Sequence, residues 1–136
     1  MAWQIVVLKT TSGPAWIREP TEDEIVSLGT VSEIQDMVND SFSTTKWSDE
    51  QHGHYVAIDE SFTMSFFISS ENETQGMVID VRGGRESIPA VVEFARKNDL
   101  QLFDCSATWM NLDDPSDEGW RGYDSLRRSA LNERSE

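Results

Sequence analysis

The one cluster of metal-ligand side-chain types lies at residues 49–54, where Asp49 and Glu50 precede His52-Gly53-His54. Two imidazoles and two carboxylates are donors that zinc accepts in a tetrahedral site. Two histidines spaced two residues apart in a loop match no common structural zinc pattern, and no cysteine lies nearby in the sequence. We interpret these residues as solvated loop side chains and predict no metal site. A small metal-dependent hydrolase that uses His52 and His54 is the alternative.

A second candidate is the segment 80–85, Asp-Val-Arg-Gly-Gly-Arg, which ends a predicted strand and precedes a predicted helix. Glycine amides at a helix N-terminus can hold an anion, and Arg82 and Arg85 would add positive charge. The segment has neither the phosphate-loop pattern ending in Lys-Ser/Thr nor the G-x-G-x-x-G pattern. A tight turn with positive φ is the favoured interpretation. An anion-binding regulatory module is the alternative.

Nucleophilic catalysis has little support in the sequence. Cys105 is the one cysteine, and a free cysteine in an apolar strand is usually a small buried hydrophobe. The many Ser and Asp residues allow Ser/His/Asp triads to be assembled arbitrarily. We therefore predict that the protein is not an enzyme and uses no cofactor. A lone cysteine forms no internal disulfide, which favours a reducing compartment such as the cytoplasm.

The charge distribution is the strongest signal. Residues 1–81 carry 14 acids and three bases, a net charge of −11, whereas residues 82–136 carry 11 acids and eight bases, near −3. Such a surface repels nucleic acid and anionic lipid, and it attracts basic partners over a Debye length of about 10 Å at ordinary salt. No apolar run approaches the roughly 20 residues that span a bilayer. We expect a basic protein partner, no nucleic acid and no membrane.

Periodicity and capping signals define the elements that would position these residues. Apolar residues with a period of two, or short apolar runs, predict strands at 3–9, 55–58, 61–69, 75–82, 100–105 and 108–112. The first run is typical of a strand and not of a signal peptide. Threonine followed three residues later by glutamate opens helices at Thr21 and Thr30, and Ser87 is a plausible N-cap of a third. The predicted helices are 21–28, 30–42 and 87–98.

The element order β-α-α-β-β-β-α-β-β predicts an α+β fold. We expect a single domain over residues 1–118, with a mostly antiparallel sheet of about five to six strands and two main helices packed on one face. Residues 43–54 are predicted to form a loop, and residues 70–73 a turn. Residues 119–136 are predicted to be a polar C-terminal tail, loose or weakly helical.

Acidic side chains beside tryptophan have the composition of a binding hot spot that faces a basic surface. Trp47 and Trp120, each in a predicted polar loop, are expected to contact a partner, whereas Trp109 is equally well explained as a core residue. The predicted partner-binding residues are Glu33, Asp36 and Asp40 on one side of the helix at 31–41, Trp47, Asp49 and Glu50 in the following loop, and Asp59 and Glu60.

Four segments carry a resemblance to a known group. They are Leu28-Gly29-Thr30 with the helix to Phe42, Trp47-Ser48-Asp49, Val81-Arg82-Gly83-Gly84 after the alternating strand, and Leu102-Phe103-Asp104-Cys105. Over residues 25–112 the chain resembles a widespread group of small uncharacterised bacterial proteins. Those proteins are similar to the immunity partners encoded beside polymorphic or contact-dependent toxins. The shared motifs are structural, so the resemblance implies a cytoplasmic inhibitor of a cognate toxin domain but assigns no functional residue.

Charge and resemblance lead to the same functional hypothesis. Toxin domains that attack nucleic acid, such as nucleases, are often basic because they must grip phosphates. An inhibitor that presents carboxylates where phosphates would lie gains rapid, salt-sensitive association. We therefore expect a non-enzymatic immunity protein that neutralises a basic toxin domain by forming a tight complex.

Overall fold

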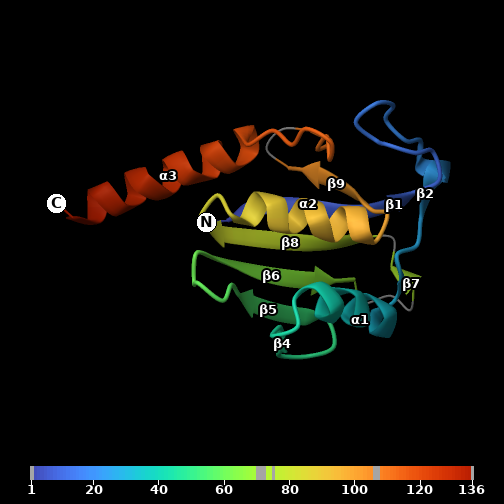
Figure 1. The fold of residues 1–136 in the computed structure, drawn as a ribbon, viewed down its shortest axis with the longest axis horizontal. Helices are drawn as coiled ribbons and strands as arrows, with labels where there is room; N and C mark the ends of the chain where they lie inside the picture. The colour runs from blue at the N-terminus through green and yellow to red at the C-terminus, as the bar shows by residue number, and fades with distance from the viewer. Residues whose placement is uncertain (1, 70–72, 75, 106–107, 136) are drawn as a thin grey trace.

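The computed structural model describes residues 2–69, 73–74, 76–105 and 108–135, and it has an α+β fold built on an antiparallel sheet (Figure 1). The strand order is β2-β1-β8-β6-β5-β4, and β9 pairs with β1 on the same side as β2. The strands of this sheet are β1 (Trp3–Thr10), β2 (Ile25–Val26), β4 (Lys46–Trp47), β5 (His52–Val56), β6 (Phe62–Ile68), β8 (Gly76–Gly83) and β9 (Gln101–Asp104). The predicted fold class is confirmed.

The remaining elements are a two-stranded sheet, a short 3-10 helix and three α-helices. Strand β3 (Gly29–Thr30) pairs with β7 (Glu73–Thr74). The helices are η1 (Glu22–Glu24), α1 (Val31–Ser41), α2 (Ser87–Lys97) and α3 (Glu118–Ser135). Figure 1 shows α1 and α2 on the same side of the sheet, whereas α3 extends away from the body. None of the described helices is long and apolar enough to cross a membrane.

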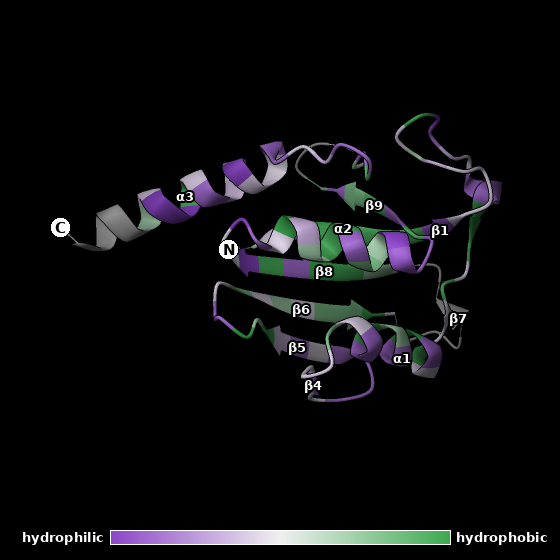
Figure 2. Cartoon of the chain, viewed as in Figure 1, coloured by the Kyte–Doolittle hydropathy of each residue, from purple (hydrophilic) through white to green (hydrophobic). Residues whose placement is uncertain are grey.

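The core lies between the sheet and the two helices. Alternation along the strands points Ile5, Phe66 and Ile79 toward the helices, and all three are 0% exposed. Helix α1 adds Ile34 and α2 adds Val91 to the same layer, and neither is exposed to solvent. Figure 2 shows α2 alternating between hydrophobic and hydrophilic residues, as expected of a helix with one buried face. We call the opposite side of the sheet the helix-free face.

The two predicted capping boxes have different outcomes. At Thr30 the box forms, with Thr30 Oγ1 accepting from Glu33 N at 3.2 Å, and α1 follows as predicted. At Thr21 the backbone amide donates to Glu24 Oε1 at 3.0 Å, but only η1 follows, so the predicted helix at 21–28 is wrong. The chain leaves the helical conformation because Ile25 and Val26 pair with the end of β1.

The structure corrects three further local predictions. The predicted loop at 43–54 contains β4 and the start of β5, which pair with each other and so place His52 and His54 on a strand. The predicted strand at 108–112 is reduced to an isolated bridge between Trp109 and Phe103. Ser87 is the first residue of α2 and Glu86 is its N-cap. Apart from Glu73, the predicted turn at 70–73 lies outside the described residues.

Most of the predicted tail forms α3, whose first turns pack on the body. Trp120 is 9% exposed and Tyr123 is 6% exposed. Trp120 Nε1 donates to Gly83 O at 3.1 Å, and Gly83 N donates to Tyr123 Oη at 2.7 Å. The expectation that Trp120 lies in an exposed polar loop is therefore wrong, because its ring closes one end of the core.

Candidate protein-binding surface

Helix α1 forms one surface with β4 and the β4–β5 loop, because two hydrogen bonds join it to them. Gln35 Nε2 donates to Glu50 O at 2.7 Å, and Trp47 Nε1 donates to Asn39 Oδ1 at 2.9 Å. Six of the eight predicted partner-binding residues lie on these elements. We call this set the acidic surface, and its members are Glu33, Asp36, Asp40, Trp47, Asp49 and Glu50.

The carboxylates of the acidic surface differ in whether they already have a bonding partner within the chain. Glu33 Oε1 accepts from Thr30 N at 3.0 Å, and that backbone bond together with the Thr30 hydroxyl lowers the pKa of Glu33. Asp40 lies 2.6 Å from Lys97 Nζ of α2. Within the described part of the chain, the carboxylates of Asp36 and Glu50 have no ion-pair partner. These two charges are the ones most available to another molecule.

Asp49 fixes the conformation of the β4–β5 loop. Its carboxylate accepts from Gln51 N at 2.8 Å and from His52 N at 3.0 Å, and it lies 2.9 Å from His52 Nδ1. The bond with the imidazole and then the bond with the Gln51 amide lower the pKa of Asp49, so this carboxylate is ionised at neutral pH. The loop is therefore held in one conformation by a charged group that is itself part of the surface.

Trp47 is a structural link more than a free contact residue. Its side chain is half-buried against the core, and a Cβ on Gly53 would lie 2.9 Å from its ring. Its indole nitrogen is occupied by Asn39. Gln35 and Asn39, which hold α1 to the β4–β5 loop and to β4, were not among the predicted site residues. Their spacing of four residues places them on one flank of a helix, and that is the signal that could have indicated a shared role.

Asp59 and Glu60 lie apart from the acidic surface, in the β5–β6 turn at the other end of β5. Asp59 Oδ1 accepts from Ser61 Oγ at 2.6 Å and from Ser61 N at 3.0 Å, and these bonds lower the pKa of Asp59. Glu60 has a φ of 61°, in the left-handed region. Five residues of strand, about 16 Å, separate this turn from the loop that carries Asp49 and Glu50.

The histidines are not arranged for the catalytic alternatives. His54 Nδ1 lies 3.3 Å from Ser65 Oγ, and Asp80 pairs with Ser65 from the next strand. A catalytic triad needs the imidazole between the hydroxyl and the carboxylate. Here the serine lies in the middle, so Asp80 cannot orient His54. Among the described residues, no group of three or more His, Cys, Asp or Glu side chains could hold a metal ion.

The glycine loop at the start of α2 uses its donors within the chain. Gly83 N donates to Tyr123, and Gly84 N donates to Ser61 O at 2.7 Å. Arg85 Nη1 lies 2.7 Å from Asp117 Oδ2. The positive φ of 108° at Gly83 agrees with the predicted tight turn. An anion at this place would have to displace these internal bonds.

Cys105 is poorly suited to act as a nucleophile. Its thiol is exposed, and its pKa is raised, first by partial burial and then by the negative charges of Asp104 and Asp80. Because the thiolate is the reactive form, a raised pKa lowers reactivity at neutral pH.

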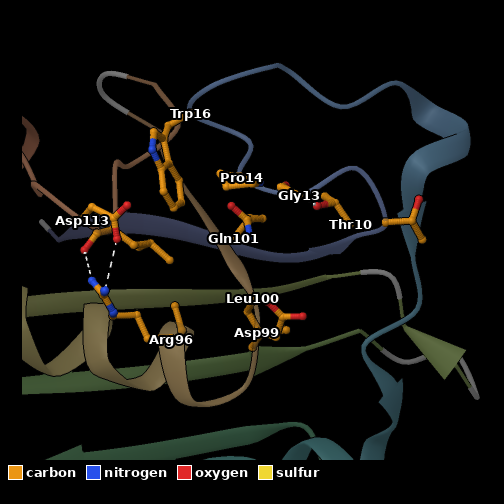
Figure 3. Close-up of a pocket in the computed structure, with 12 residues that line it drawn as sticks. Thr10, Gly13, Pro14, Trp16, Arg96, Asp99, Leu100, Gln101 and Asp113 are labelled. Atoms are coloured by element: carbon orange, nitrogen blue, oxygen red, sulfur yellow. Dashed lines mark hydrogen bonds and ion pairs between the residues drawn. The ribbon is translucent and has the colours of Figure 1, made fainter.

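A pocket of about 450 Å³ lies between the loop after β1 and the C-terminal end of α2 (Figure 3). Arg96 reaches from α2 and donates to Leu112 O at 2.6 Å and to Asp113 Oδ1 at 3.1 Å. Gln101 Oε1 accepts from Ala15 N at 3.0 Å. Trp16 covers one side of the pocket. These polar groups mainly hold the loop and the 112–113 segment against the sheet and α2.

A comparison of the chain with protein-family models and with curated proteins finds no match. The geometry and charge of the acidic surface are therefore the features from which a function can be inferred.

Proposed function

We propose that the protein is a non-enzymatic inhibitor that binds a basic toxin domain through the acidic surface, as immunity proteins of bacterial toxin systems do. The observation that carries the proposal is the pair of hydrogen bonds that join α1 to β4 and to the β4–β5 loop. These bonds hold Asp36 and Glu50 on one preformed surface before a partner arrives. A preformed surface loses less conformational entropy on binding than a mobile one.

The chemistry of the acidic surface favours a partner that normally grips phosphates. Five carboxylates lie on α1 and the adjoining loop, and Lys97 is the one side chain that forms a Lys or Arg ion pair with any of them in the described part of the chain. A nuclease toxin domain presents Lys and Arg at its substrate site, and carboxylates can occupy the positions of the substrate phosphates. The resemblance to immunity-like proteins supports the same role and a cytoplasmic location.

The direct test is to co-express the chain with the product of the neighbouring gene and to purify the complex. We expect a one-to-one complex whose dissociation constant rises when salt is increased from about 0.05 M to about 0.5 M, because the Debye length shortens over this range. Isothermal titration calorimetry at both salt concentrations measures the effect. Failure of the two proteins to co-purify at low salt, with a neighbouring gene unrelated to any toxin, would count decisively against the proposal.

A pair of charge-reversal variants separates the acidic surface from net charge. Asp36→Lys with Glu50→Lys changes the two carboxylates of the acidic surface that take part in neither an ion pair nor a capping bond in the described chain. The matched control is Glu22→Lys with Asp23→Lys, which makes the same charge change on η1, beside β2 at the opposite edge of the sheet. We expect the first variant to lose about tenfold or more in affinity and the control to change little. Equal losses would mean that net charge alone attracts the partner.

A further inference from the structure

A pocket of about 320 Å³ lies between the C-terminal end of α1 and the side of α2, so it opens on the helix side of the sheet and not on the helix-free face. We call it the aromatic pocket. Phe42, Phe62 and Phe94 are each at most 7% exposed and form its floor, and Tyr55 is half-buried beside them. The ring centroids of Phe42 and Tyr55 are 4.9 Å apart. The volume is at the lower end of the range for ligand sites, about 300–1,000 Å³, which suits one large side chain.

The rim of the aromatic pocket carries charged groups from both helices. Asp40 comes from α1, whereas Glu93 and Lys97 come from α2 and lie about one turn apart. Lys97 Nζ lies 2.6 Å from Asp40 Oδ2, so one cation already rests at the rim. In the described part of the chain, the Glu93 carboxylate and the Tyr55 hydroxyl have no hydrogen-bond or ion-pair partner. The aromatic pocket therefore offers acceptors that the chain itself does not use.

We propose, on the basis of the function proposed above, that the aromatic pocket receives an arginine side chain of the basic partner. The apolar stem of the arginine packs on the aromatic floor, and its guanidinium donates to Glu93, to the Tyr55 hydroxyl and to Asp40. Asp40 is also a member of the acidic surface, so the pocket adjoins the carboxylates that are proposed to face the partner. A side chain that fills a pocket beside a charged surface is the usual anchor of a protein interface.

Arginine fits these groups better than lysine does. A guanidinium is planar, carries five donors and is more weakly hydrated than an ammonium group, so it loses less hydration on entering an aromatic pocket. Arginine is also one of the residues that contribute most to the binding energy of interfaces. Lys97 limits the affinity of the pocket, because its ammonium group competes with the incoming guanidinium for Asp40. Removal of this ammonium group should therefore strengthen binding.

The purified chain alone tests the proposal, with N-acetyl-arginine amide as a probe that carries the arginine side chain. In a nuclear magnetic resonance titration, we expect saturable shifts of the backbone amides of Tyr55, Ala90 and Glu93, which line the pocket. N-acetyl-citrulline amide, the neutral isostere, should bind at least about fivefold more weakly, because it makes no charge-assisted hydrogen bond. Equal binding of the citrulline probe or of N-acetyl-lysine amide, or shifts spread evenly over the acidic surface, would overturn the proposal. Because no partner is present, these results reject the pocket alone, whereas failure to co-purify counts against the proposed function.

Two matched pairs of variants, all at exposed positions, locate the site. Glu93→Gln removes a carboxylate from the rim, and Glu86→Gln removes the same charge at the N-cap of α2, about 10 Å away along the helix. We expect Glu93→Gln to weaken binding of the arginine probe at least about fivefold and Glu86→Gln to leave it within about twofold. Lys97→Met removes the competing ammonium group, and Lys9→Met removes a cation from β1; only Lys97→Met should strengthen binding, by about twofold or more. Equal effects within either pair would mean that net charge attracts the probe, and the proposal would then be wrong.

Discussion

Gly119 and Gly122 lie three residues apart in α3, and we expect their substitution by alanine to change the free energy of unfolding in opposite directions. In a helix interior, glycine is about 1 kcal/mol less favourable than alanine, so propensity alone predicts that both substitutions stabilise the protein. A Cβ at Gly119, however, would lie 1.8 Å from Asp104 Oδ2 and 2.5 Å from Asp104 Cγ, whereas a Cβ at Gly122 has nothing within 4 Å. Asp104 is 4% exposed, so its carboxylate cannot turn into solvent without leaving a buried site.

The size of the destabilisation by Gly119→Ala follows from which groups must move to make room for the Cβ. Relieving the contact at Gly119 requires a shift of more than 1 Å in α3 or in Asp104, and overpacking of this kind costs about 1–3 kcal/mol. If the first turn of α3 detaches instead, exposure of Trp120 and Tyr123 raises the loss to about 3–5 kcal/mol. We therefore expect Gly119→Ala to destabilise by at least about 1 kcal/mol and Gly122→Ala to stabilise by about 0.5–1 kcal/mol.

Urea unfolding monitored by circular dichroism measures both free energies of unfolding, and an unchanged m-value confirms that the comparison is valid. Stabilisation by both variants would refute the argument, because it would mean that α3 does not approach Asp104 as closely as the structure has it. Destabilisation by both would mean that Gly122 lies in a contact that the structure does not contain.

Two further predictions concern the capping boxes. The Arg18 guanidinium, 2.5 Å from Glu24, and then the Thr21 amide lower the pKa of Glu24 from 4.5 to about 2. The stability from this carboxylate is therefore present above pH 4.5 and is lost as pH falls toward 2. We expect the melting temperature of Glu24→Gln to be lower than that of the unmodified protein at pH 7 and equal to it near pH 2. A difference in melting temperature that stays constant with pH would contradict this assignment. Thr30→Ala removes the α1 cap and should lower the free energy of unfolding by about 1 kcal/mol, whereas no change in urea unfolding would show that the cap is dispensable.

The elements that the sequence predicted well are those whose causes are local. Helix α1 has its capping box and its apolar spacing within twelve residues, and both survive in the structure. The same capping box at Thr21 is followed only by η1, because Ile25 and Val26 pair with the end of β1. The loop predicted around His52 became a strand for a similar reason. Gly53 occupies the helix side of β5, where the Trp47 ring fills the space of a side chain, and no local pattern reveals that contact.

The residues of the candidate surface also differ in whether local sequence could indicate them. Exposure of Asp36 and Asp40 follows from helical periodicity, so the sequence could indicate them. The bond from Gln35 to the Glu50 carbonyl depends on how α1 lies against the β4–β5 loop. The separation of Asp59 and Glu60 from the other acids likewise appears only when β5 is placed between them. Composition indicated that the surface is acidic, and the tertiary structure determined which residues belong to it.

The pairing of β1 has a consequence for how the chain is made. Its neighbours in the main sheet include β8 and β9, and Leu8 pairs with Gln101, roughly 90 residues later. A ribosome adds about 5–20 residues per second, so the first strand leaves the exit tunnel roughly 5–20 s before its last partner is synthesised. For most of that interval, until β8 has been made, the buried residues Trp3, Ile5 and Val7 lack the strand that pairs with them. An unpaired strand with exposed apolar side chains is prone to aggregation, so this is the stage of synthesis at which the chain is most vulnerable.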